Sequence, residues 1–320
     1  LHKAIRRQRQ MCIRDSSYEA TNVPTSITEK AQAAANNVVK IINNSANALK
    51  VILRNLKVDA GDTNKSAVTI SSSAGVKLEL EGKNELTGGS SGNSGISVSE
   101  VWNGNANVPG GKLTIQGKEG SSLSTTGGSG TKGGSFGICA TSGKLDLVNA
   151  TVTATGGFGG GSGISANDEV NIKNSKLTAK GGGQLHPGED TSTGGGTGIS
   201  LFVKGKVVVG EGSEVIAIGG DHKTVKKSAW GGAALRFYGT GVGCGYEVQK
   251  GGKLTAIGGN AESKSGVVTG GDALNGTCGG IVSSGETTLI GGNAKSGSGK
   301  ATGGNASFYD GNSCLLYTSP

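Results

Sequence analysis

The sequence contains little proline, few aromatic residues and no long apolar run. Only 4 of its 320 residues are proline, and 4% are aromatic. This composition excludes an extended proline-rich linker and a core built mainly on aromatic rings. No stretch reaches the roughly 18 consecutive apolar residues of a membrane-spanning helix, so we expect no membrane insertion within this sequence.

Cysteine and histidine are also scarce, with five and three residues respectively. Cys139, Cys244 and Cys278 lack the short paired spacings of a zinc site. They are either three separate small thiols or a Cys244–Cys278 disulfide with one thiol left over. His186 and His222 each lie in a long polar stretch without a visible partner. The sequence therefore predicts no catalytic residues, no metal site and no cofactor.

Both ends of the chain back-translate into sequencing-adapter DNA. Residues 6–15 match one strand of a common adapter and residues 314–320 match the other. We therefore expect residues 1–16 and 314–320 to be adapter-derived, and the intervening part to be a fragment of a longer protein. Residues 1–16 carry +4 of the formal net charge of +8, through Lys3, Arg6, Arg7, Arg9 and Arg14 against Asp15. This excludes a native basic arm and with it a nucleic-acid partner.

Glycine is abundant, at 62 residues, and short alternating strand patterns recur between the glycine-rich stretches. Residues 143–157 show the pattern: Leu145 and Leu147 alternate with polar residues, Asn149 ends the run, and a second strand begins at Val152. Alternation with period two is typical of a strand with one buried face. The strand patterns keep their length while the glycine-rich stretches vary, as in a solenoid with insertions at one corner.

Three short strands per repeat predict an all-β fold, a parallel β-helix of about eight coils with variable glycine-rich loops. We place it at residues 37–297, after a leading segment at 17–36 and before a glycine-rich continuation or frayed last coil at 298–313. Ser26 and Glu29 have the spacing of a capping box, which favours a short helix in the leading segment.

The repeat also predicts which residues stack on one another. One inward stack is expected to contain Leu78, Leu113, Leu145, Val170 and Val207. A further strand is expected to begin at Ile96, Ile138, Ile164 and Ile199, with weaker copies at 235–237 and 280–282. A corner column contains only glycine and asparagine, at Gly120, Asn149, Asn174, Gly212 and Gly251. Because these two residue types adopt a left-handed backbone most easily, the column predicts a turn with positive φ.

Several of these rungs resemble a known family. Gly111-Lys-Leu-Thr-Ile-Gln-Gly117, the stretch 78–87 and Val152-Thr-Ala-Thr-Gly-Gly157 are similar to rungs of the glycine-rich right-handed parallel β-helix repeat proteins of bacterial cell surfaces. Many of those proteins are described as carbohydrate-binding, and pectin-degrading enzymes of the pectate-lyase type share the fold. The resemblance implies a right-handed coil and an extracellular or cell-surface location. It brings no catalytic motif.

Acidic and amide residues follow several glycine pairs, at Asp221, Asn260, Asp272, Asn293 and Asn305. The pattern partly resembles calcium-binding β-roll repeats, but it lacks the second glycine and the aspartate at the required offsets. We interpret these residues as turn residues, and Ca²⁺ is an unsupported alternative.

Two outward columns are candidate binding surfaces. The first is expected to align Lys77, Lys112, Lys144, Glu169, Lys206 and Glu247. Three successive lysines on neighbouring strands repel one another, so the column is either a solvated edge or a site for an anionic ligand.

The second column is expected to align Ser99, Thr141, Asn167, Phe202 and Tyr238. Phe202 and Tyr238 would form a flat apolar strip, with Arg236 beside it and Trp230 in a loop at 219–232 that folds over it. Aromatic faces with a charged donor nearby suit sugar binding. The alternative is a cross-strand aromatic pair that only stabilises the sheet.

These observations predict a non-enzymatic extracellular scaffold or adhesin-like module of bacterial, metagenomic origin. Its expected partner is a polysaccharide, an acidic one in particular, or a host or cell-wall glycan. The alternative function is a polysaccharide lyase or glycoside hydrolase of the β-helix type. The sequence leaves the oligomeric state open.

Overall fold

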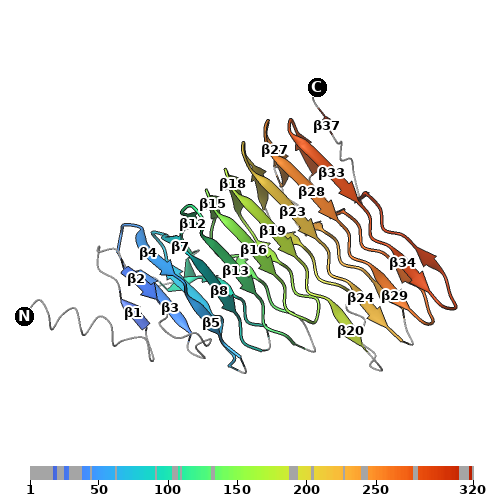
Figure 1. Cartoon of the computed structure of the whole chain (residues 1–320), viewed down its shortest axis with the longest axis horizontal. Coiled ribbons are helices and arrows are strands. Elements are labelled where there is room, and N and C mark those ends of the chain that lie inside the picture. The colour runs from blue at the N-terminus through green and yellow to red at the C-terminus, as the bar shows by residue number, and fades with distance from the viewer. Residues whose placement is uncertain are drawn as a thin grey trace, which may run out of the picture.

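The structure, a computed structural model, describes most of the chain. The described residues are 17–19, 25–28, 38–43, 45–61, 63–90, 92–102, 107–108, 110–130, 134–186, 194–202, 205–225, 228–238, 244–276, 280–309 and 317–318. Every regular secondary-structure element among them is a β-strand, and most of these strands lie in long parallel sheets (Figure 1). The predicted all-β class is therefore confirmed.

Three long sheets contain most of the described strands. The first consists of β1 (Ser17–Glu19), β3 (Val39–Asn43), β6 (Val68–Ser72), β9 (Ile96–Ser99), β14 (Ile138–Ala140), β17 (Ile164–Ala166), β21 (Ile199–Leu201), β26 (Leu235–Phe237), β31 (Leu274–Gly276) and β36 (Ser307–Tyr309). The second consists of β2 (Thr25–Thr28), β4 (Leu49–Arg54), β7 (Val76–Glu81), β12 (Leu113–Gly117), β15 (Leu145–Val148), β18 (Glu169–Lys173), β22 (Lys206–Val209), β27 (Gly245–Val248), β32 (Gly280–Ser283) and β37 (Tyr317–Thr318). The third consists of β5 (Lys57–Asp59), β8 (Lys83–Thr87), β13 (Ser122–Thr126), β16 (Thr151–Thr155), β19 (Lys176–Lys180), β23 (Glu214–Ile218), β28 (Lys253–Ile257) and β33 (Glu286–Ile290).

Successive repeats of the chain lie side by side. Leu113 of β12 pairs with Val76 of the preceding repeat and with Leu145 of the following one, and both pairings are parallel. Figure 1 shows the repeats following one another along the long axis from blue to red. Because strands pair with their counterparts in neighbouring repeats, the arrangement is consistent with a parallel β-helix solenoid.

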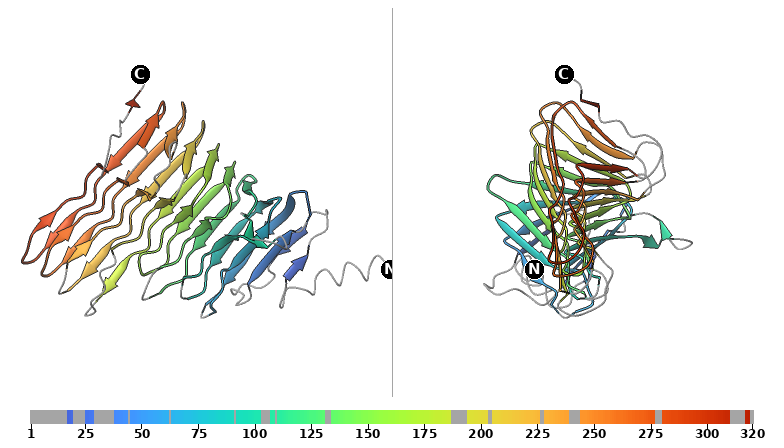
Figure 2. Two further views of the ribbon diagram at one scale, coloured as in Figure 1. Left: turned by 180° about the vertical axis from the view of Figure 1, so that it is seen from behind. Right: turned by 90° about the vertical axis from the view of Figure 1, so that its right-hand side faces the viewer.

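Smaller elements extend this stack. A fourth parallel sheet consists of β20 (Gln184–His186), β24 (His222–Thr224), β29 (Ala261–Ser263) and β34 (Ala294–Ser296). A fifth consists of β25 (Ala229–Trp230), β30 (Val268–Thr269) and β35 (Ala301–Thr302). β10 (Val101–Trp102) and β11 (Asn107–Val108) form an antiparallel hairpin that projects from the side of the stack (Figure 2, right).

The side chains that point between the three long sheets form one continuous core. Leu113, Leu145, Val170 and Val207 lie in it fully buried, as predicted. Two large aromatic residues in the described part of the core, Phe237 and Tyr246, contact each other edge to face with ring centroids 4.9 Å apart. The buried hydroxyl of Tyr246 donates a hydrogen bond of 3.2 Å to the carbonyl of Ile199, which satisfies its only donor.

The predicted stack contains one error of register. Val76, not Leu78, pairs with Leu113, whereas Leu78 pairs with Ile115 in the adjacent inward stack. Both residues are buried. A shift of two residues preserves the alternation of inward and outward side chains, so the hydrophobic pattern alone does not distinguish the two registers.

Paired strands also lie outside residues 37–297. β1 and β2 pair with β3 and β4, so paired strands begin before residue 37, and Ser26 lies in a strand rather than at a helix cap. Residues 29–37, with the remaining part of the predicted helix, lie outside the described residues. Beyond residue 297, β35, β36 and β37 continue the ladders. Residues 280–282 belong to the second sheet rather than to the first.

The predicted corner of glycine and asparagine is confirmed. Every predicted member has positive φ, and the column begins two repeats before the first predicted member, Gly120. Its members, with φ between 48° and 79°, are Asn55, Gly82, Gly120, Asn149, Asn174, Gly212 and Gly251. The amide of Asn174 donates a hydrogen bond of 3.1 Å to the side-chain oxygen of Asn149. Asparagine at this corner therefore also links one repeat to the next.

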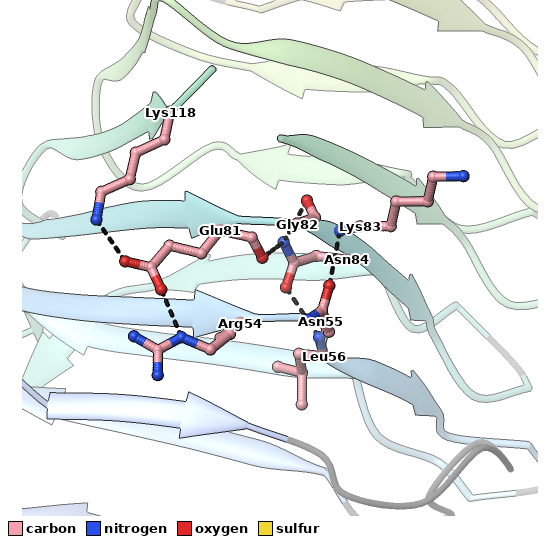
Figure 3. A network of polar contacts seen from close by, with 8 residues as sticks. All are labelled: Arg54, Asn55, Leu56, Glu81, Gly82, Lys83, Asn84 and Lys118. Carbon is pink, nitrogen blue, oxygen red and sulfur yellow. Dashed lines mark hydrogen bonds and ion pairs between the residues drawn. The ribbon is translucent and has the colours of Figure 1, made fainter. Parts of the chain in front are cut away.

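A polar network holds this corner in the early repeats (Figure 3). Glu81 accepts a hydrogen bond of 2.5 Å from Arg54 Nε in the preceding repeat and forms an ion pair with Lys118 in the following repeat. Asn84 is buried in the core position of the next strand, and its side-chain oxygen accepts a hydrogen bond of 2.9 Å from the Leu56 N–H. Three consecutive repeats are thereby tied together.

Replacing Glu81 with glutamine should reduce thermal stability in a pH-dependent way. The hydrogen bonds from Arg54 and then Lys118 lower the pKa of Glu81 from 4.5 to about 2. Since this pKa is depressed in the folded state, the carboxylate stabilises the fold above its unfolded pKa, and the contribution is lost as the pH falls from about 4.5 to about 2. We expect Glu81→Gln to have a lower melting temperature than the parent at pH 7 and the same melting temperature as the parent near pH 2.

Melting curves at several pH values measure this effect. Glu119→Gln is the control, because Glu119 is exposed at the next corner and has no ion pair within the described part of the chain. An equal difference between Glu81→Gln and the parent at every pH would contradict the ionic explanation.

A seam of glycines separates the main core from the two small sheets, and the sequence analysis did not predict it. In the later repeats one glycine pair precedes the strand of the fourth sheet, and another follows the strand of the fifth sheet. Their backbones contact directly: Gly196 N–H donates to the Gly182 carbonyl at 2.8 Å, and Gly220 N–H donates to the Gly196 carbonyl at 2.7 Å. The same zigzag continues through Gly232, Gly259, Gly271, Gly292 and Gly304.

Only glycine fits at this seam, because the opposing backbones leave no space for a side chain. A Cβ at Gly182 would lie 1.9 Å from the carbonyl oxygen of Gly157, and one at Gly220 would lie 2.1 Å from that of Gly182. Beyond the seam, Ala229, Ala261 and Val268 form a separate small core between the fourth and fifth sheets. The glycine-rich stretches are thus packing elements of the fold.

Candidate functional site

The aromatic pair predicted on the outer side of the first sheet is present. Phe202 follows β21 and Tyr238 follows β26, and the two strands pair in register. The rings are stacked, with centroids 4.7 Å apart and planes inclined by 8°. Tyr238 is 46% exposed and Phe202 is half-buried.

The orientation of the rings differs from the predicted flat strip. Their centroid separation is close to the spacing of ~4.8 Å between neighbouring strands, so the rings stack along the axis of the repeats. Phe202 covers one face of Tyr238, and the Arg236 guanidinium carbon lies 4.6 Å from the centroid of that ring. The stack therefore presents ring edges to solvent, while the Phe202 face turned away from Tyr238 points toward the preceding repeat.

Arg236 is the charged group of this site. It lies two residues before Tyr238 on the same strand and rests on the tyrosine ring, as cations do on aromatic faces. No carboxylate of the described residues pairs with it, in contrast to most lysines of the second sheet. Its guanidinium keeps free hydrogen-bond donors for an anionic group.

Trp230 does not belong to this site. It lies in β25 of the fifth sheet, where it pairs with Thr269 of the next repeat, and its ring is 40% exposed. The expected loop at 219–232 contains β24 and β25, both paired with the following repeat, rather than a flap over the aromatic residues. Lys226 and Lys227 lie outside the described residues.

The middle of the predicted lysine column aligns on neighbouring strands as expected, namely Lys112, Lys144, Glu169 and Lys206, but its two ends do not. Lys77 aligns with Thr114 rather than with Lys112, by the same two-residue shift that displaced Leu78, and Glu247 is displaced from Lys206 in the same way. Each lysine has an acidic partner: Lys77 lies 3.5 Å from Glu79, Lys112 lies 3.0 Å from Asp146, and Lys144 lies 3.3 Å from Glu169. The column therefore needs no anionic ligand to relieve repulsion.

A shallow hollow of about 300 Å³ lies on the outer side of the second sheet. Glu169, Lys206, Glu247 and Gln249 are among its lining residues. Lys206 Nζ lies 2.6 Å from Glu247 and, with a smaller contribution from Gln249, lowers the pKa of that carboxyl. A carboxylate held ionised in this way is poorly suited to act as a general acid.

The turn residues after the glycine pairs have a structural role. The side-chain oxygen of Asp221 accepts a hydrogen bond of 2.7 Å from Asn260 N–H, and that of Asn260 accepts one of 2.9 Å from Asn293 N–H. Asp272 does the same for Asn305 N–H at 2.8 Å. Each side chain therefore bonds the backbone of the next repeat, and no group of three or more His, Cys, Asp or Glu residues in the described part could hold a metal ion.

The remaining sequence candidates lie apart from the aromatic stack. His222 is buried between the fourth and fifth sheets, and its Nδ1 accepts a hydrogen bond of 3.1 Å from Trp230 N–H, so it has the partner that the sequence did not reveal. Cys244 is buried, and Cys278 lies outside the described residues, so their pairing stays untested. The His186 side chain is likewise outside the described part.

Comparisons with protein-family models, curated proteins and solved structures found no match for this chain. The resemblance of its rungs to bacterial surface β-helix proteins therefore stays a prediction. Among the described residues, no helix has the length and apolar character needed to cross a membrane.

Proposed function

We propose that this protein is a right-handed parallel β-helix that acts as a non-enzymatic extracellular scaffold or adhesin-like module and binds acidic polysaccharide. The observation that carries this proposal is the Phe202–Tyr238 stack, with Arg236 resting on it and paired with no carboxylate of the described residues. Aromatic rings beside a free guanidinium suit a sugar that has an apolar face and a carboxylate.

The orientation of the stack sets where the sugar would lie. Arg236 and Phe202 both contact the Tyr238 ring, and the Phe202 face turned away from Tyr238 is directed toward the preceding repeat. At the equivalent position that repeat has Asn167, whose side chain is smaller than an aromatic ring. A sugar ring placed there packs against Phe202 and receives hydrogen bonds from the Asn167 amide. The Arg236 guanidinium, one repeat further on, binds the carboxylate of the adjoining sugar unit.

The scaffold role rests on the regular stack of parallel sheets, which holds the aromatic side chains at the fixed spacing of neighbouring strands. The extracellular location rests on the resemblance of the rungs to bacterial surface proteins. The alternative, a lyase or hydrolase, requires carboxylates available for proton transfer, whereas Glu169 and Glu247 of the hollow are paired with lysines.

Binding to a glycan panel that includes uronic-acid polymers tests the proposal. We expect the parent to bind an acidic polymer, with affinity that decreases as salt is added. Phe202→Ala/Tyr238→Ala should lose about tenfold in affinity or more, since each of the two rings contributes about 1 kcal/mol. Trp230→Ala is the matched control, because it removes an exposed aromatic ring of the fifth sheet.

The outcomes separate the candidate functions. Equal losses in the double variant and in Trp230→Ala, or no binding by the folded parent to any glycan, would contradict the proposed site. Release of unsaturated or reducing sugars by the parent would instead support the enzymatic alternative.

A further inference from the structure

The outer side of the third and fourth sheets carries an unusual pattern in its last repeats. Figure 1 shows β24, β29 and β34 continuing beyond the ends of β23, β28 and β33 on the same side of the molecule. We call the outward residues of these six strands the striped face. It is independent of the aromatic site, which follows the first sheet.

An apolar column runs through the middle of this face. Ile218, Ile257 and Ile290 pair with one another in register on neighbouring strands, and all three side chains point outward. Ile290 is 47% exposed, and the other two are half-buried. In the preceding repeats the same column holds Lys180 and Thr155, so the apolar stretch is confined to three repeats.

Charged columns flank the isoleucines on both sides. The first column, four residues before each isoleucine, reads Glu214, Lys253 and Glu286. The second, five residues after each isoleucine, reads Lys223, Glu262 and Lys295. In each of these three repeats the two flanking residues have opposite charge, and the sign alternates from one repeat to the next. Neighbouring charges within each column also pair with each other, Lys253 with Glu286 at 2.8 Å and Lys223 with Glu262 at 2.9 Å.

This pattern is complementary to itself under one rotation. A two-fold axis that runs along the isoleucine column exchanges the two charged columns and keeps the order of the repeats. It places each charge opposite one of opposite sign, because the flanking residues are nearly equidistant from the isoleucine. A two-fold axis along the strand through the middle repeat would instead place Glu214 opposite Glu286 and is disfavoured by repulsion.

We propose that the striped face binds a second copy of this chain, with the repeat axes of the two copies parallel and the two-fold axis along Ile218, Ile257 and Ile290. In this dimer the isoleucines of the two copies pack together. Glu214 faces Lys223 of the partner subunit, Lys253 faces Glu262 of the partner subunit, and Glu286 faces Lys295 of the partner subunit. Each contact occurs twice, as an isologous interface requires.

The size of the striped face indicates how tightly the two copies should bind. Ten residues of extended chain span about 33 Å, and three repeats span about 14 Å, so each copy would bury roughly 470 Å². That is well below the ~800 Å² per partner of a standard stable interface, so the dimer is expected to be weak. The dimer is therefore expected to dissociate in the micromolar range.

Sedimentation equilibrium of the full chain tests the apolar part. The parent should dimerise in the micromolar range, and Ile257→Asp should weaken dimerisation at least about tenfold, since it places two carboxylates at the centre of the interface. Thr153→Asp is the matched control, an outward position on β16 of the same sheet, and should dimerise like the parent. A parent that stays monomeric up to about 0.5 mM, or a folded Ile257→Asp variant that dimerises like the parent, would overturn the proposal.

Charge reversal tests the orientation of the two copies. Lys253→Glu places like charges together twice and should weaken dimerisation about tenfold or more, whereas Lys83→Glu, outside the face, should leave it unchanged. Adding Glu262→Lys to Lys253→Glu restores opposite charges across the axis and should recover most of the affinity. Melting temperatures check that every variant is folded. If the double variant dimerises no better than Lys253→Glu, the proposed parallel arrangement is wrong.

Discussion

Replacing Gly182 with alanine is expected to lower the free energy of unfolding by about 3 kcal/mol or more. The added Cβ would lie 1.9 Å from the carbonyl oxygen of Gly157 and 2.7 Å from its carbonyl carbon. Both atoms belong to the backbone of a paired repeat, so neither moves without breaking hydrogen bonds of the seam. Chemical denaturation monitored by circular dichroism measures the loss.

The neighbouring glycine provides a matched control. A Cβ at Gly183 would meet only the Asp221 carbonyl oxygen, at 3.4 Å, which is ordinary contact, and Gly183 does not have positive φ. We expect Gly183→Ala to change stability by less than about 1 kcal/mol, since alanine also restricts the unfolded chain. Similar effects of the two substitutions would contradict the close approach of backbones at the seam.

Replacing Leu145 with aspartate is expected to have the largest effect, a loss of about 5 kcal/mol or complete unfolding. Leu145 is fully buried and stacks between Leu113 and Val170. An ionised carboxylate there has only apolar neighbours above and below it in its own stack. Because desolvation raises the pKa of such a group, the deficit should be smaller near pH 4 than at pH 7.

The control for this variant is Leu145→Met, which keeps the volume and apolar character and should cost less than about 1.5 kcal/mol. Urea denaturation of both variants at pH 7 measures the difference. A Leu145→Asp protein as stable as the parent would show that this strand does not face the core.

The hydrophobic alternation of the sequence predicted the strands and their inward sides but not every register. Leu145, Val170 and Val207 were aligned correctly, since they pair in register on neighbouring strands. Leu78 was misaligned by two residues. Since both registers bury leucine or valine, the choice depends on which backbone groups pair, and only the three-dimensional structure shows this.

The candidate sites were likewise predicted in part by the sequence pattern and decided in part by the three-dimensional structure. Phe202 and Tyr238 were correctly placed on neighbouring strands because Ile199 and Leu235 start equivalent strands. The direction in which the rings stack depends on side-chain rotamers, which the sequence does not specify. The rings therefore present their edges to solvent instead of the predicted flat strip of ring faces. The lysine column was misaligned at its two ends, Lys77 and Glu247, and only the three-dimensional structure shows the ion pairs of its lysines.

The sequence by itself determined the class of fold, the inward residues and the left-handed corner, because each depends on local chemistry: period-two alternation, side-chain polarity and the backbone preference of glycine and asparagine. The tertiary structure alone decided the glycine seam, the ion pairs and the striped face. Most of these features join residues from about 12 to 40 positions apart, and the variable length of the glycine-rich stretches conceals their alignment until the repeats are stacked.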